Sequence, residues 1–73
     1  MSAIEASQQC DTIAELIDDD VPEAALDKAP EFFEDVREKV IEVQETIQES
    51  GTVTEAQQTA LDNWEAGVRR WIR

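Results

Sequence analysis

Regularly spaced carboxylates are the residues of this sequence with the clearest chemical potential. Between Pro30 and Ser50, glutamates recur at intervals of three and four residues, at Glu31, Glu34, Glu38, Glu42, Glu45 and Glu49. On an α-helix these intervals place all members on one face, about 27 Å long, with neighbours about 5–6 Å apart. Like charges at this spacing repel one another, so the pattern predicts a surface of one sign.

This row of carboxylates has three interpretations. Carboxylates on a rigid helix can stand in for phosphates and occupy a basic cleft built for DNA or RNA. Five further acids would extend such a row around the corner that precedes it: Asp18, Asp19, Asp20, Glu23 and Asp27. Alternatively, the row is an ordinary solvated helix face, or it reflects adaptation to high salt. Only the first interpretation defines a function, and it names a basic nucleic-acid-binding host protein or complex as the partner.

The composition excludes several classes of function. The chain has 73 residues, with 18 Asp and Glu, 6 Lys and Arg, no His and a net charge of −12. Such a chain is repelled by nucleic acid, because nucleic-acid binding depends on basic side chains that neutralise phosphates. It also lacks histidine, the commonest acid–base group and metal ligand. We therefore expect neither direct nucleic-acid binding nor an enzyme.

Metal and cofactor sites are not expected either. The acids Asp18, Asp19 and Asp20 are consecutive and are followed by Val21 and Pro22, whereas calcium loops need alternating oxygen ligands and a glycine at the sharp turn. No acid interrupts an apolar stripe, so no carboxyl is expected to have the raised pKa that general acid catalysis requires. The sequence thus predicts no catalytic residue, no metal ligand and no cofactor.

Length, cysteine usage and hydropathy indicate a single cytoplasmic domain over residues 1–73. The single cysteine cannot form an internal disulfide, which fits a reducing compartment. Residues 1–16 lack the basic and apolar regions of a signal peptide. No apolar run approaches the roughly 20 residues that a membrane span needs, so no membrane contact is expected.

The elements that position these groups are helical. Ser2 and Glu5 have the spacing of a capping box, and an apolar stripe follows at Ala3, Ala6, Cys10, Ile13 and Ile17. The three aspartates from Asp18 to Asp20 are expected to end this helix. Pro22 then predicts a short helix through Leu26, capped by Asp20 or Val21.

Two longer helices follow. Residues 30–50 carry apolar positions at Phe33, Val36, Val40, Val43 and Ile47, widened by Phe32 and Ile41. Gly51 is the expected residue after the helix end. Thr54 and Gln57 predict a second capping box that opens a helix through about Trp71. The short link makes the two helices an antiparallel hairpin, so we predict an all-α three-helix bundle with a short extra helix between its first and second long helices.

Three further features have structural and functional interpretations. Cys10 lies on an apolar stripe and is expected in the core. Trp64 and Trp71 share one helix face; core packing is favoured for Trp64, whereas Trp71 fits either the core or an interface with a partner or a second copy of the chain. The basic group of Arg69, Arg70 and Arg73 complements the helix dipole, as cations in a last helical turn do. Trp71 is therefore a candidate partner-binding residue. The alternative function is a helical protein–protein interaction or dimerisation module that uses this C-terminal face to bind a host subunit or form a homodimer, with the acids serving solubility.

The segment Pro30–Trp71 resembles a helical-hairpin pattern of small phage and mobile-element proteins. The matching features are FFEDV from Phe32 to Val36, the Gly51–Thr54 turn, Gln57 with Ala60 and Leu61, and Gly67-Val68 followed by Trp71. In size and acidity the chain is also similar to phage inhibitors of host defence, which include anti-CRISPR proteins and DNA mimics. This resemblance implies a helical inhibitor that acts in the host cytoplasm.

Overall fold

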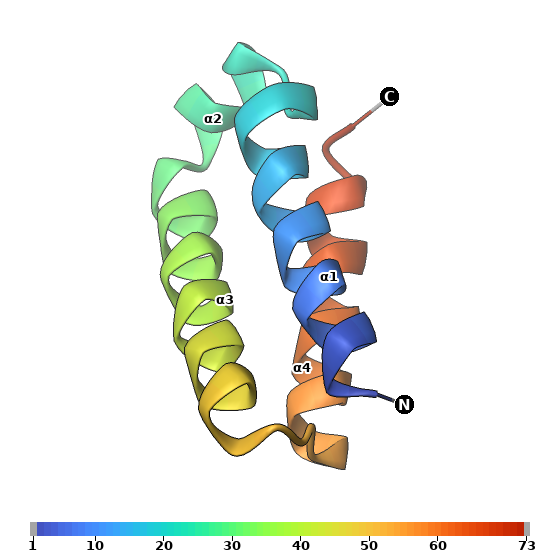
Figure 1. Cartoon of the computed structure of the whole chain (residues 1–73). Helices are drawn as coiled ribbons and strands as arrows, with labels where there is room; N and C mark the ends of the chain where they lie inside the picture. Colours follow the sequence, from blue (N-terminus) through green and yellow to red (C-terminus); the bar gives the residue numbers. More distant parts are fainter. Residues whose placement is uncertain (1, 73) are drawn as a thin grey trace.

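The structure is a computed structural model that describes residues 2–72 of the chain (Figure 1). Local sequence signals account for most of its helix ends. The elements are α1 (Ala3–Glu15), a π-helical turn η1 (Leu16–Asp20), α2 (Glu23–Lys28), α3 (Pro30–Ser50) and α4 (Glu55–Arg69). No strand occurs between residues 2 and 72. The all-α class is confirmed, and the arrangement is consistent with three long helices and one short one.

The predicted caps are largely present. At the start of α4, the Thr54 hydroxyl accepts a hydrogen bond from the Gln57 amide N–H (3.1 Å), and the Gln57 side-chain oxygen accepts one from the Thr54 N–H (2.8 Å). At the end of α3, Gly51 has φ of 72°, a left-handed conformation that favours glycine. The Ser2 hydroxyl caps Glu5 N–H at the start of α1 (3.1 Å). These contacts satisfy backbone groups that a helix end leaves unpaired.

The first helical segment ends within the three aspartates, as predicted, but its last turn is not α-helical. Beyond Glu15 the chain continues to Asp20 as η1, in which the Val21 N–H donates to the Leu16 carbonyl five residues back (2.9 Å). The predicted cap of the short helix at Asp20 or Val21 was wrong. Val21 is extended because it precedes a proline, Pro22 takes the cap position, and α2 begins at Glu23.

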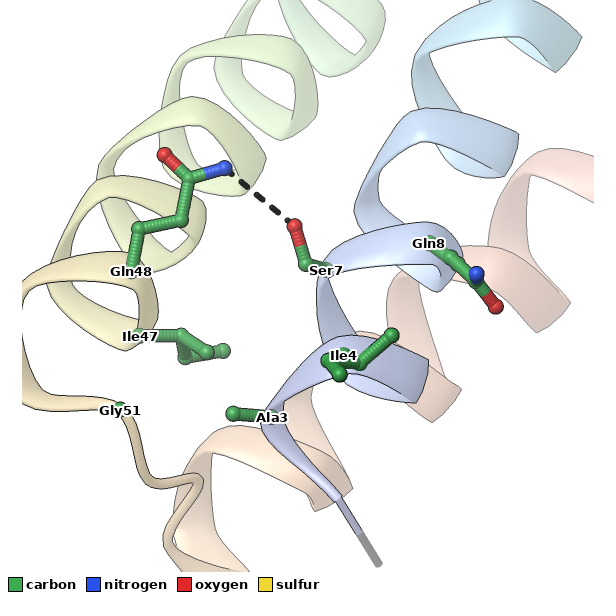
Figure 2. A pocket seen from close by; sticks show the side chains of 7 residues that line it. All are labelled: Ala3, Ile4, Ser7, Gln8, Ile47, Gln48 and Gly51. Atoms are coloured by element: carbon green, nitrogen blue, oxygen red, sulfur yellow. Dashed lines mark hydrogen bonds between the residues drawn. The ribbon is translucent and has the colours of Figure 1, made fainter.

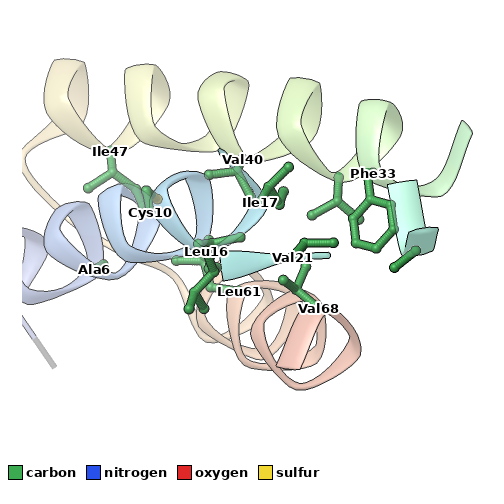
Figure 3. Packing of buried hydrophobic residues seen from close by; sticks show 13 residues of the cluster. Ala6, Cys10, Leu16, Ile17, Val21, Phe33, Val40, Ile47, Leu61 and Val68 are labelled. Atoms are coloured by element: carbon green, nitrogen blue, oxygen red, sulfur yellow. The ribbon is translucent and has the colours of Figure 1, made fainter. Parts of the chain in front are cut away.

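The three long helices enclose one apolar core. α3 and α4 are joined through residues 51–54 and run antiparallel, and α1 lies against both (Figure 1). Buried side chains from every element meet between them (Figure 3). The buried set is Ala6, Cys10, Ile13, Leu16, Ile17, Val21, Ala25, Phe33, Val36, Val40, Ile47, Leu61 and Val68. Most of the stripes predicted for the first helix and for residues 30–50 therefore lie in the core, and Leu61 and Val68 of α4 complete it.

Neutral amide side chains link α1 to its two neighbours. Towards α3, Gln44 Nε2 donates to Asp11 Oδ1 (2.8 Å) and to the Ser7 carbonyl (3.1 Å). Towards α4, Gln9 Nε2 donates to Asp62 Oδ1 (3.0 Å), and Gln9 Oε1 accepts from Gln58 Nε2 (2.8 Å), which also donates to Asp62 Oδ1 within α4 (2.9 Å). These two donors hold the pKa of Asp62 below its usual 3.8, because they stabilise the charged form.

The capping box of α4 generates a prediction about stability. Thr54→Ala removes the hydroxyl that caps Gln57 N–H, so the free energy of unfolding should fall by about 1 kcal/mol. Thr59→Ala is the matched control, because Thr59 is exposed within the same helix and alanine favours helix there. Urea unfolding measures both variants. Equal destabilisation of the two would contradict the assigned role of the cap.

Candidate functional site

The six glutamates of α3 form one exposed surface, called here the carboxylate stripe: Glu31, Glu34, Glu38, Glu42, Glu45 and Glu49. All six side chains are exposed, and helical geometry places them on the face opposite the buried seam of Phe33, Val36, Val40 and Ile47. The structure thus brings these predicted residues together. Because α3 continues for 21 residues without interruption, the spacing of the charges is set by a rigid element.

The cations nearest to the carboxylate stripe in sequence are engaged elsewhere. Arg37 forms a bidentate salt bridge with Asp18, in which Nη1 lies 2.9 Å from Oδ1 and Nη2 lies 2.9 Å from Oδ2. Lys39 Nζ lies 2.9 Å from Asp35 Oδ2, one turn away on α3. Within residues 2–72, no member of the stripe has an ion pair. No cation of the described residues therefore pairs with the stripe.

A second group of acids surrounds the turn between α1 and α3 and is called here the acidic corner: Asp18, Asp19, Asp20, Glu23 and Asp27. All five are exposed. The wide η1 turn directs Leu16, Ile17 and Val21 inward, which leaves the aspartates on the outside. Asp18 differs from the others because its carboxylate is neutralised by Arg37, and that pair also ties η1 to α3.

The Trp71 side chain packs against the core on one side and lines a surface groove on the other. Its ring meets Phe33 edge to face, with ring centroids 5.9 Å apart and planes at 67°. The side chain is half-buried and also lines a surface groove next to Phe32 and Arg70. The two alternatives predicted for Trp71 are therefore not exclusive. α4 ends at Arg69, two residues before the predicted helix end, so Trp71 lies beyond the helix.

Cys10 and the acids show no arrangement suited to metal binding in the described part. Cys10 is 1% exposed and belongs to the core, as predicted. Burial, and secondarily the charge of Asp11, raises the pKa of the Cys10 thiol to about 11. No group of three or more His, Cys, Asp or Glu side chains between residues 2 and 72 is placed to hold a metal ion.

A groove of about 420 Å³ lies between the start of α1 and the end of α3 (Figure 2). Ile4 and Ile47 contribute apolar surface to it, and Gln48 Nε2 donates to Ser7 Oγ across it (3.3 Å). None of its lining residues is charged. The groove therefore does not continue the carboxylate stripe and offers no acid–base chemistry.

Sequence reasoning placed two exposed apolar residues of α3 incorrectly. Phe32 and Ile41 were expected to widen the buried seam, but they are 38% and 46% exposed. Their positions on the helical wheel gave the available signal, because each lies well away from the direction of Phe33, Val40 and Ile47. Ile41 borders the carboxylate stripe between Glu38 and Glu45, and Phe32 lines the groove beside Trp71.

Comparison with protein-family models, with curated proteins and with solved structures finds no match to this chain. The fold and the composition define the chain as a small acidic helical bundle. Among residues 2–72, no helix combines the length and the apolar character that crossing a membrane requires.

The environment of Cys10 generates a chemical prediction. Because its pKa is raised from 9.0 to about 11, the folded protein holds Cys10 as a neutral, buried thiol at pH 8. Iodoacetamide at pH 8 should alkylate the urea-unfolded chain at least about tenfold faster than the native chain. Mass spectrometry over time measures both rates. Equal rates would show that Cys10 is accessible in the native state.

Proposed function

We propose that this chain is an acidic binding protein of the phage inhibitor type. It occupies the basic surface of a nucleic-acid-binding host protein or complex, by presenting carboxylates where that surface normally holds phosphates. The observation that carries the proposal is the carboxylate stripe, whose members have no ion pair within residues 2–72 even though Arg37 and Lys39 lie on the same helix.

The regular repeat of the charges along one rigid axis supports this proposal, and their density is lower than that of the phosphates along a DNA strand. The stripe provides about one carboxylate per helical turn of 5.4 Å, while each strand of duplex DNA has one phosphate per 3.4 Å or so of its axis. The acidic corner adds exposed charges at the start of α3. A partner with a row of Lys and Arg would meet several carboxylates at once. Because the stripe lies on a continuous helix, little backbone conformational entropy is lost when it binds.

Members of the candidate surface differ in their expected contributions. Asp18 already pairs with Arg37, so a partner would gain less from it than from Asp19 or Asp20. The central residues Glu38, Glu42 and Glu45 have like-charged neighbours on both sides along the stripe, so a bound basic surface relieves the most repulsion there. We therefore expect Glu38, Glu42 and Glu45 to contribute the largest share of the binding free energy. The proposal involves no catalytic step, and the site of action is the host cytoplasm.

Displacement of host proteins from DNA tests this function and does not require the partner to be identified first. A bacterial lysate is bound to DNA-cellulose at low salt, and the purified chain is then applied. The wild-type chain should elute at least one basic protein, because its carboxylates compete with phosphates. The Glu38→Gln, Glu42→Gln, Glu45→Gln triple variant should need at least about tenfold more protein for the same elution, as expected when three charge contacts are lost.

The matched control is a second triple variant with the same net charge, Glu5→Gln, Glu15→Gln, Glu55→Gln. These three acids are exposed but lie outside α3. If the control loses as much activity as the stripe variant, net charge rather than the stripe is responsible. If the wild-type chain displaces nothing, the proposed function is wrong.

A further inference from the structure

The acid of α3 that lies one helical turn from Arg37 is Glu34, a member of the carboxylate stripe. The other α3 positions three and four residues from Arg37 hold apolar side chains, namely Phe33, Val40 and Ile41. Opposite charges three residues apart are neighbours on a helix surface and pair readily, best with the acid on the N-terminal side. Helix geometry alone would therefore pair Arg37 with Glu34.

The structure pairs Arg37 with Asp18 instead. Both guanidinium contacts, each of 2.9 Å, go to the Asp18 carboxylate, which belongs to η1 and not to α3. A bidentate pair of this kind is stronger and more directional than a single charge contact. Glu34 is exposed and has no ion pair within residues 2–72. The charge of Arg37 is thus held apart from the nearest glutamate of the stripe.

Lys39 provides a comparison on the same helix. Its Nζ lies 2.9 Å from Asp35 Oδ2, four residues earlier, although Glu42 of the stripe lies three residues later. Asp35 and Lys39 both belong to α3, so their pair needs no contact with another element. The Arg37 pair instead needs η1 to lie beside α3, so it depends on the tertiary fold.

We propose that Asp18 is a positioning residue of the carboxylate stripe: it holds Arg37 away from Glu34 and so keeps that glutamate available to a basic partner. The sequence predicted Asp18 as a residue that touches the partner, whereas in this role it acts through Arg37. The effect on a host partner rests on the proposed function, but the position of the guanidinium does not.

The exposure of the Asp18–Arg37 pair makes this role accessible to substitution. The two side chains are 42% and 50% exposed, and ion pairs at such sites contribute little to folding stability. Asp18→Asn therefore leaves the bundle folded and frees the guanidinium. Because Glu34 is the acid one turn away, Arg37 then pairs with it, and the stripe loses one of its six charges.

Proton NOEs of the full chain test where the Arg37 side chain lies. In the wild-type chain, the Arg37 side-chain protons should show NOEs to the Hβ protons of Asp18 and none to the Hγ protons of Glu34. In Asp18→Asn, NOEs to the Glu34 Hγ protons should appear. Circular dichroism checks that the variant is folded. A released Arg37 that contacts Asp19 or Asp20 instead, or that gains no NOE to Glu34, overturns the proposal.

Binding of an octa-arginine peptide at low salt tests the consequence for the stripe without the host partner. Asp18→Asn should raise the dissociation constant of the peptide about threefold, because one carboxylate of the stripe is neutralised. Glu55→Gln is the matched control, since it removes the same charge from an exposed acid of α4 that has no ion pair within residues 2–72. It should change the dissociation constant less than about twofold.

A double-mutant cycle with Arg37→Gln separates the positioning role from a direct contact. When Arg37→Gln is already present, Asp18→Asn should weaken peptide binding less than about twofold, because no cation is left to move. A direct contact from Asp18 predicts the reverse order, since Asp18 is unpaired once Arg37 is removed. That reverse order, or equal effects in both backgrounds, overturns the proposal. If the wild-type chain displaces nothing from DNA-cellulose, the proposed function fails, while the NOEs and the cycle still decide the role of Asp18.

Discussion

The structure depends on an apolar seam that holds a self-repelling helix in place. On one side of α3, Phe33, Val36, Val40 and Ile47 are buried against α1 and α4, while six glutamates share the opposite side. Each fully buried side chain of this type contributes about 1.5–3 kcal/mol, whereas each like-charged pair one turn apart costs a few tenths. The seam therefore outweighs the repulsion, and α3 can carry an unneutralised row of charge without losing its helical form.

The contacts between helices preserve the negative charge of acids outside the stripe as well. Where α1 meets α3 and α4, carboxylates accept hydrogen bonds from the neutral amides of Gln9, Gln44 and Gln58. An amide donor satisfies a carboxylate and leaves its negative charge in place, whereas Lys or Arg would cancel it. Arg37 and Lys39 are committed to acids outside the stripe. The packing of the bundle and the negative potential of its surface are thus compatible, which is the condition that phosphate mimicry requires.

The sequence predicted features that depend on local chemistry and missed those that depend on neighbours. The bounds of α3 follow from Pro30 and Gly51, whose backbone preferences act wherever they occur. The position of Ile41 on the helical wheel indicated a place at the edge of the buried face, but how far that face extends depends on where α1 and α4 lie. The stripe was predictable from helical periodicity alone, but its lack of ion pairs was not, because the partner of Arg37 lies 19 residues away in η1.

The free energy of unfolding as a function of NaCl tests the central claim most directly, namely that the stripe is an unneutralised, self-repelling surface. From about 20 to about 500 mM NaCl, the wild-type chain should gain about 1 kcal/mol as screening reduces the repulsion. The Glu38→Gln, Glu42→Gln, Glu45→Gln variant keeps only the Glu31–Glu34 pair of the stripe, so it should gain less than half as much. A wild-type stability that does not change with salt, or an equal gain in both proteins, would contradict this account.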